Sequence, residues 1–210
     1  SDFAHARIIS INSLDVGAMP GVVVIFTAQD LEDEFKPIRA TSRMANYYAT
    51  ELVALARGKV RYVGEAVVAG VAHSRYLAED ALDAIEVVYD PLPAIVDVWD
   101  SKKGDVLLFE EHGTNMALEY EGSLGEADRV FAEADYTRKE EFRCHRHTGN
   151  PLETRGLVAS FATGTGDLTV WGETKVPHFN RGVLASLLEL PEHRIPVSYT
   201  HLPLPTNREV

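Results

Sequence analysis

The chain of 210 residues is predicted to fold as an α+β protein, because strand-like and helix-like segments are mixed along it. Val22–Phe26 is an apolar, β-branched run that is typical of a buried strand. Ser42–Arg57 instead carries apolar residues at helical spacing. Further along, Thr163–Asp167 has turn chemistry between the apolar runs Gly156–Ala162 and Leu168–Trp171, which predicts a β-hairpin. No internal repeat is evident.

After the first strand, the sequence carries capping and helix signals. Thr27 and Asp30 have capping-box form, a hydroxyl followed three residues later by a carboxylate. A helix is expected over Ser42–Arg57, with Gly58 as its C-terminal stop. The apolar stripe of that helix consists of Met44, Tyr48, Leu52 and Leu55.

The next elements are a strand, a helix and a second strand. Val60–Val71 is rich in Val and Ala and predicts a strand that bends near Gly64. Ser74 is the expected N-cap of a helix. Glu86–Tyr89 predicts a strand, which the prolines of Asp90–Pro93 end. The buried stripe expected for the helix is Leu77, Ala81, Ala84 and Ile85.

The second half begins with a polar stretch. Residues 99–124 contain several glycines and are interpreted as a connecting segment. A short helix is expected within Leu124–Ala134 and a strand over Asp135–Arg146. After the hairpin, Pro177 suits the first turn of a helix. The stripe which that helix would bury is Phe179, Val183, Leu184, Leu187 and Leu188.

Composition excludes several classes of function. The formal charge of −12 argues against nucleic acid or an anionic membrane as the main partner. No apolar run approaches the roughly 20 residues of a membrane span, and no signal peptide is evident, so a cytoplasmic protein is expected. Cys144 is the single cysteine, which excludes an internal disulfide and a cysteine-ligated iron–sulfur cluster in this chain.

Several runs of the sequence resemble one enzyme family in the correct order. They are Ala4–Ile8, Val60–Val67, Ser74–Ala81, Val88–Asp97, Pro151–Gly156 and Trp171–Arg181. The first four resemble the α/β-hammerhead domain of the large subunits of xanthine dehydrogenase, aldehyde oxidase and carbon monoxide dehydrogenase. The last two resemble the start of the molybdenum-binding region of the same subunits. Successive matches in order are far more specific than a single motif.

The resemblance implies a domain organisation and an activity. We expect an α/β-hammerhead domain at 1–98, a linker at 99–124 and the N-terminal piece of a molybdopterin-binding domain at 125–196. The intact enzyme would be a molybdenum-dependent oxidoreductase that oxidises or hydroxylates a small molecule with oxygen from water. The family's glycine-rich loop and general-base Glu are absent from these residues, so the fragment alone is expected to be inactive.

Cofactors and partners follow from the same resemblance. It implies molybdopterin in the cytosine dinucleotide form, with molybdenum. The fragment has one Cys and no dinucleotide fingerprint, so iron–sulfur clusters and FAD are expected on an iron–sulfur subunit and an FAD-binding subunit. The substrate is a small molecule whose identity the sequence does not reveal.

Lys175 is the main departure from the family pattern and the one candidate cofactor-binding residue. The family usually has a Gln at this position, beside the metal, where its amide can donate a hydrogen bond. A Lys would place a mobile cation there, which suggests an anionic or carbonyl substrate. The alternative is that Lys175 only begins a helix at a surface.

Other candidate residues have simpler structural interpretations. Glu153 and Arg155 share a face of an extended segment and are expected to form an ion pair. His178 and Arg181, at i,i+3 helical spacing, are interpreted as solvated helix residues; the alternative is that they face the cofactor or a partner subunit. Cys144–His147 is not predicted to bind zinc, because the sequence supplies no further cysteine or paired histidines to complete the site. Glu110–His112 is interpreted as an exposed linker rather than an acid–base site.

Residues 197–210 abandon the family pattern and resemble a translated sequencing adapter. We expect a non-native tail that does not extend the sheet in register; the alternative is a divergent, disordered terminus. Two rival functions also stay open. One is a non-catalytic family member that acts as an assembly or interaction module, suggested by the loss of the usual Gln. The other is a stand-alone binding protein, which would require residues 131–196 to fold alone.

Overall fold

Two structural units make up the chain in the computed structural model, and each is described by itself. The residues described are 1–32, 34–40, 42–144, 147, 149, 152, 156–172, 174 and 176–199. The first unit comprises Ser1–Glu119 with Ser186–Glu189, and the second comprises Tyr120–Ala185 with the chain from Leu190 onward.

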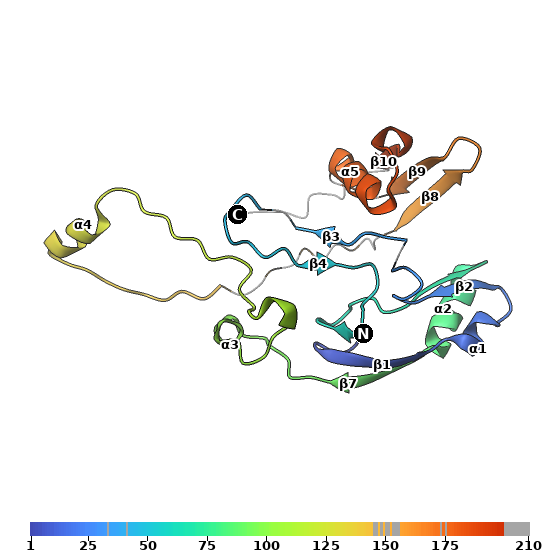
Figure 1. The fold of residues 1–210 in the computed structure, drawn as a ribbon, viewed down its shortest axis with the longest axis horizontal. Coiled ribbons are helices and arrows are strands. Elements are labelled where there is room, and N and C mark those ends of the chain that lie inside the picture. The colour runs from blue at the N-terminus through green and yellow to red at the C-terminus, as the bar shows by residue number, and fades with distance from the viewer. Residues whose placement is uncertain are drawn as a thin grey trace. The chain divides into compact units, whose positions relative to one another are not determined.

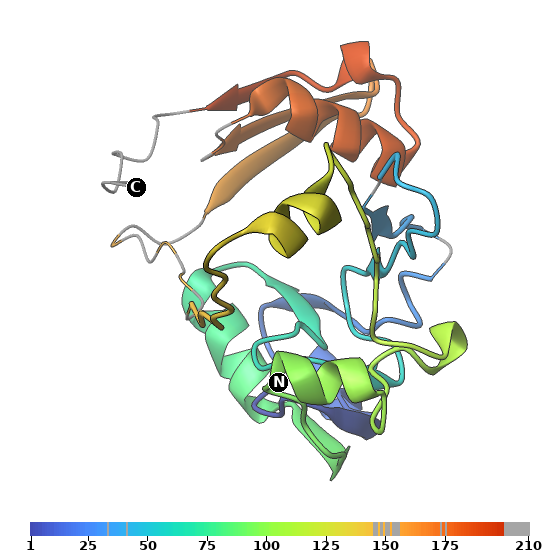
Figure 2. The ribbon, with the colours of Figure 1, turned by 90° about the vertical axis from the view of Figure 1, so that its left-hand side faces the viewer.

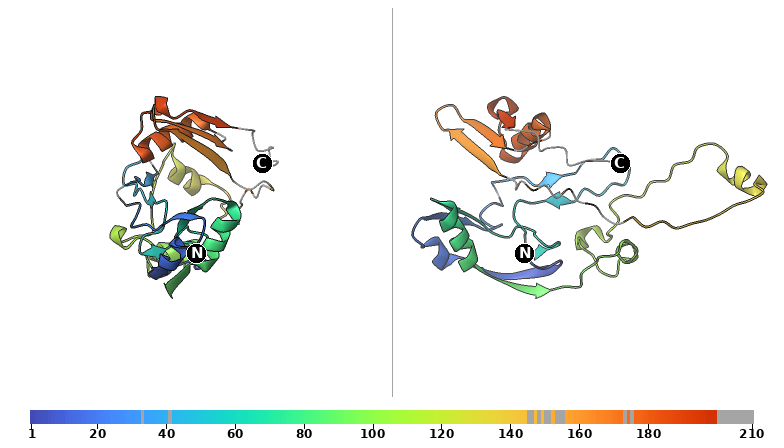
Figure 3. Two further views of the ribbon diagram at one scale, coloured as in Figure 1. Left: turned by 90° about the vertical axis from the view of Figure 1, so that its right-hand side faces the viewer. Right: turned by 180° about the vertical axis from the view of Figure 1, so that it is seen from behind.

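The first unit contains a three-stranded antiparallel sheet of order β5-β1-β7, in which β1 and β7 lie side by side (Figure 1). A second pair, β2 with β6, is covered by helix α2, which lies across it (Figure 3). The elements of this unit are β1 (Ala6–Asn12), α1 (Leu14–Gly17), β2 (Val22–Phe26), β3 (Ile38–Arg39), β4 (Glu51–Leu52), β5 (Lys59–Val60), β6 (Ala69–Ala72), α2 (Arg75–Ala84), β7 (Glu86–Pro91), α3 (Val98–Lys103) and η1 (Glu110–His112).

The core of this unit lies where β1 meets β5. Ala6 and Val60 are opposite each other in the antiparallel register, and both are fully buried. Ala56 and Val67 complete the buried cluster. Half-buried Ile8, Ile11, Val68, Val87 and Tyr89 pack around it. Small and β-branched side chains let these short strands approach closely, and burying them supplies most of the stabilisation.

Several predicted elements of the first unit are confirmed. Val22–Phe26 is strand β2, and Glu86–Tyr89 lies within β7. Ser74 caps α2, because its hydroxyl accepts the Leu77 N–H at 3.3 Å. Of the stripe predicted for this helix only Ala81 is fully buried.

The helix predicted over Ser42–Arg57 is wrong. This segment is irregular apart from β4, and Tyr48 donates its N–H to the Ala117 carbonyl at 2.9 Å instead of continuing a helix. Of the stripe predicted for this helix only Leu55 is buried, while Met44 and Leu52 stay about half exposed, at 45% and 52%. Helical spacing without a surface to bury against does not stabilise a helix.

Two further differences concern turns. Val60–Val71 is not one strand, because a turn with Gly64 at φ +88° separates β5 from β6. The Asp30 carboxylate accepts both the N–H and the hydroxyl of Thr27 at 2.7 Å, which holds its pKa below the usual value. The Thr27–Asp30 motif is followed by a turn, although a capping box usually precedes a helix.

A mixed three-stranded sheet of order β10-β9-β8 organises the second unit, and helix α5 runs beside it (Figure 2). The elements are α4 (Ala127–Glu133), β8 (Leu157–Ala162), β9 (Asp167–Gly172), α5 (Pro177–Leu188, whose last three residues are assigned to the first unit), η2 (Glu192–Arg194) and β10 (Val197–Tyr199). The predicted hairpin, the short helix before it and the helix from Pro177 are confirmed. The strand predicted over Asp135–Arg146 is wrong for 135–144, where the chain is irregular and exposed.

The expectation that the chain after Pro196 adds nothing to the sheet is wrong for Val197–Tyr199. These residues form β10, parallel to β9, and the Val170 N–H donates to the Pro196 carbonyl at 3.0 Å. Backbone pairing of this kind does not depend on which side chains the strand carries. The non-native origin of residues 197–210 stays a prediction.

Candidate functional site

Lys175, the predicted cofactor-binding residue, lies outside the residues that the structure describes, as do Glu153 and Arg155. Its neighbour Thr174 is buried, with 8% of its surface exposed. The Thr174 hydroxyl accepts a hydrogen bond from the Asn180 side-chain amide. This contact joins the segment before α5 to the second turn of that helix.

The first turns of α5 carry the two polar residues that the sequence pattern singled out. His178 is exposed, in agreement with a solvated helix residue. Arg181 is half-buried and lies 3.5 Å from the Glu192 carboxylate. The Arg181 atom in this contact is the Nε, which is buried and, within the described part of the chain, has an ion-pair partner in Glu192 but no hydrogen bond. Arg181 is therefore only partly the solvated residue that was predicted, because its side chain is 37% exposed and its Nε lies against Glu192 of η2.

The hairpin beside α5 presents apolar side chains at its surface. Every residue of β8 is exposed, among them Leu157, Val158 and Phe161, with 54–71% of their surfaces accessible. At the other end of the sheet Ile195 is fully buried. The sheet is thus uncovered along β8, whereas the chain just before β10 is buried at Ile195.

No set of three or more His, Cys, Asp or Glu residues that could hold a metal ion occurs among the described residues. Cys144 is exposed and free, His147 is exposed, and His145 lies outside the described part. No helix among the described residues is long and apolar enough to cross a membrane.

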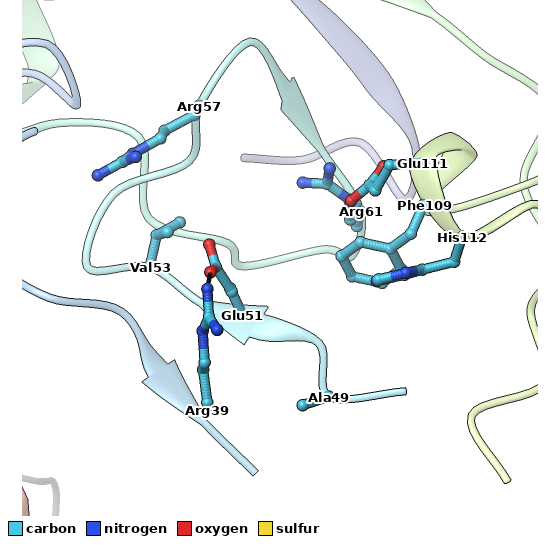
Figure 4. Close-up of a pocket in the computed structure, with 9 residues that line it drawn as sticks. All are labelled: Arg39, Ala49, Glu51, Val53, Arg57, Arg61, Phe109, Glu111 and His112. Atoms are coloured by element: carbon cyan, nitrogen blue, oxygen red, sulfur yellow. Dashed lines mark hydrogen bonds and ion pairs between the residues drawn. The ribbon is translucent and has the colours of Figure 1, made fainter. Parts of the chain in front are cut away.

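A cavity of about 400 Å³ occupies the first unit (Figure 4). The residues that line it are Arg39, Ala49, Glu51, Val53, Arg57, Arg61, Phe109, Glu111 and His112. They come from β3, β4, the segment around β5, and η1. Arg39 forms an ion pair with Glu51 across the β3–β4 pair.

The interpretation of Glu110–His112 as an exposed linker is only partly correct. Glu110 and Glu111 are exposed, but His112 is half-buried between the rings of Tyr48 and Phe109, with centroids at 5.3 and 5.9 Å. The Glu110 carboxylate accepts hydrogen bonds from the Lys59 ammonium at 2.8 Å, which lowers the pKa of Glu110. Because the Lys59 side chain is only 11% exposed, this contact fixes η1 against β5.

Sequence reasoning missed this cavity. Its charged residues are spread over more than 70 positions, from Arg39 to His112, and share no motif. The available signal was the high density of arginines between Arg39 and Arg61 in a strongly acidic chain.

Comparison with protein families gives two matches that follow one another along the chain. Residues 1–93 match the aldehyde oxidase and xanthine dehydrogenase a/b hammerhead domain, and residues 108–202 match the molybdopterin cofactor-binding domain.

Individual proteins match over nearly the whole chain. The carbon monoxide dehydrogenase large chain of Afipia carboxidovorans is 36% identical over 94% of this chain and 26% of its own length. The 6-hydroxypseudooxynicotine dehydrogenase complex subunit gamma of Paenarthrobacter nicotinovorans is 32% identical over 95% of this chain and 25% of its own length. The crystal structure of quinoline 2-oxidoreductase from Pseudomonas putida 86 superposes with a TM-score of 0.89, at 34% identity, over 97% of this chain and 26% of that chain. The chain spans about a quarter of the length of these relatives.

Proposed function

Since this chain belongs to the molybdenum-binding large subunits of the xanthine dehydrogenase, aldehyde oxidase and carbon monoxide dehydrogenase family, we propose that it is part of the large subunit of a molybdenum hydroxylase. The intact enzyme would oxidise or hydroxylate a small molecule with oxygen from water. The observation that carries this proposal is the ordered succession of hammerhead and molybdopterin-binding domains in one chain. The chain spans about a quarter of the length of its relatives, so we also propose the activity of the intact enzyme.

The partners are proposed on the same basis. One relative carries a name that describes it as subunit gamma of a dehydrogenase complex. These 210 residues contain a single cysteine, too few to ligate an iron–sulfur cluster within this part of the protein. We therefore assign electron transfer to a separate iron–sulfur subunit and a separate FAD-binding subunit, all in the cytoplasm.

The described residues fit one requirement of a pterin dinucleotide site. The cofactor is anionic, and the buried Nε–H of Arg181 makes no hydrogen bond among the described residues, its one charged neighbour there being the Glu192 carboxylate at 3.5 Å. Such an Nε–H can donate a hydrogen bond to a phosphate oxygen or a pterin oxygen. When bound, the molybdenum cofactor would supply the two-electron redox chemistry, in the cytosine dinucleotide form. This chain would contribute hydrogen-bond donors that bind and orient it.

Molybdenum content is the direct test of this proposal. The gene should be amplified from its source, sequenced across the Pro196–Val197 junction, and co-expressed in full with its neighbouring subunit genes. We expect the purified complex to contain stoichiometric molybdenum, measured by inductively coupled plasma mass spectrometry, together with iron and FAD. A folded complex free of molybdenum would instead favour an assembly or interaction module, the alternative that the departure at Lys175 raises.

We further propose that Lys175 faces the cofactor or substrate in the intact enzyme and favours an anionic or carbonyl substrate. Exchange of Lys175 for Gln should then change kcat/KM for the native substrate by about tenfold or more, as loss of one charge-assisted contact does. Steady-state kinetics of the two enzymes at equal molybdenum content measures this effect. His178→Gln is the matched control, because His178 is exposed on the neighbouring turn of α5. Equal kinetics for Lys175→Gln and the parent enzyme would place Lys175 at a surface.

A further inference from the structure

The cavity of the first unit gathers positive charge in a chain whose net charge is −12. Three arginines line it, against the carboxylates of Glu51 and Glu111. Glu51 is already engaged, because it forms the ion pair with Arg39. Arg57 makes only a loose contact with Glu32, at 3.5 Å, between side chains that are 39% and 61% exposed. A pair of this kind contributes little and leaves the guanidinium available to another anion.

Arg61 is the best-positioned of the three guanidinium groups. Its Nε donates to the Leu108 carbonyl at 2.9 Å, and its Cζ lies 4.5 Å from the centre of the Phe109 ring. One hydrogen bond and one stacked face therefore hold the group in a single orientation. Figure 4 shows it above the ring of Phe109, with Glu111 beside it.

The two terminal nitrogens of Arg61 remain as donors. Within the described part of the chain, this guanidinium forms no ion pair with a carboxylate. Its charge contributes to lowering the pKa of Glu110, but only through a longer-range electrostatic interaction. A guanidinium that is fixed by its Nε and its face presents the remaining fork of donors to an oxyanion in a bidentate geometry. Little side-chain entropy is lost when such a preorganised group binds.

The rest of the cavity suits a small organic molecule. A volume of about 400 Å³ is within the range of small-molecule sites, roughly 300–1,000 Å³. Ala49 and Val53 add apolar wall, and the rings of Phe109 and His112 add aromatic surface. An anion with an apolar or aromatic body would fit both kinds of surface.

We propose that this cavity is a binding site for a small organic oxyanion, a carboxylate or a phosphate monoester, whose charged group is held by the fork of Arg61 in the field of Arg57. The site lies within the first unit, with lining residues from the hammerhead match and from the segment that carries η1, and it does not depend on the molybdenum chemistry proposed above.

Isothermal titration calorimetry of the 210-residue chain at low ionic strength tests the proposal with two probes, benzoate and phenyl phosphate. We expect saturable binding of at least one probe, and the stronger probe identifies the preferred anion. Arg61→Gln should weaken binding by about tenfold to a hundredfold, the loss expected for a charge-assisted bidentate contact. Arg61→Lys should also weaken it, since an ammonium keeps the charge but not the fork. Arg75→Gln is the control: Arg75 pairs with Glu79 on α2, is 85% exposed, and does not line the cavity.

A measurement on the unmodified chain tests the proposal even if the Arg61 variants fail to fold. In ¹⁵N NMR spectra the stronger probe should shift the Arg61 Nε–H and the amides of 109–113. Absence of saturable binding by both probes overturns the proposal. So does binding that Arg61→Lys leaves unchanged, or a set of NMR shifts that avoids these residues.

Discussion

Exchange of Val60 for Asp should abolish the cooperative unfolding transition of the first unit. Val60 is fully buried in β5, opposite Ala6 and in contact with the small core around Ala56 and Val67. A carboxylate there would have no described cation within the cluster to pair with, and an uncompensated buried charge costs several kcal/mol or more. Because a domain is stabilised by only about 5–15 kcal/mol in total, this change alone suffices to unfold the unit. Circular dichroism during thermal and urea denaturation measures the effect.

Two control variants separate charge burial from a general sensitivity of this segment. Val60→Ala removes two methyl groups without adding a charge and should cost about 1–2.5 kcal/mol while the unit stays folded. Val63→Asp introduces the same carboxylate in the turn after β5, at a side chain that is 63% exposed. It should change stability by no more than about 0.5 kcal/mol. A Val60→Asp protein that melts like the parent would show that the cluster is not the core of this unit.

Exchange of Asn115 for Asp should detach the segment that carries α3 and η1. The Asn115 side-chain oxygen accepts the Leu108 N–H at 3.0 Å, and its amide nitrogen donates to the carbonyls of Val106 at 2.7 Å and Ser101 at 3.2 Å. Asp keeps the first bond but turns a charged oxygen toward two carbonyls. Loss of two hydrogen bonds, with repulsion added, should cost about 2–4 kcal/mol.

Hydrogen exchange by mass spectrometry should show this loss as faster exchange over 98–116. The oxyanion affinity of the cavity should fall as well, because the Leu108 carbonyl that holds Arg61 lies in the same segment. Asn46→Asp is the matched control, since it makes the same chemical change at an exposed position, and it should leave both readouts unchanged. Unaltered protection of 98–116 in Asn115→Asp would mean that contacts such as Lys59–Glu110 are sufficient to hold the segment.

Local chemistry explains which elements were predictable. The cap at Ser74, the glycine-rich turn between β8 and β9, and Pro177 at the start of α5 each act within a few residues, so the sequence pattern contains their whole cause. The irregular segment around Tyr48 is different, because its backbone is held by Ala117, far along the chain. The helical spacing of apolar residues in Ser42–Arg57 could not reveal that a hydrogen bond to Ala117 would replace the helical one.

The same distinction applies to the candidate sites. The family, its two matched domains and the position of Lys175 in the pattern follow from ordered runs of residues, which resemblance can detect. The cavity could not be predicted in this way. Arg61 gains its fixed orientation from Leu108 and Phe109, which are distant in sequence and lie in a segment interpreted as a linker.

The sequence by itself determined the family, the mixture of strands and helices, and the elements whose caps and turns are local. Only the tertiary structure decided where Ser42–Arg57 pairs, that the Nε of Arg181 is buried, and that Arg61 lines a cavity. The physical reason is that propensity and capping act over a few residues. Burial and hydrogen-bond partners, in contrast, are set by contacts between residues distant in sequence, which no local pattern encodes.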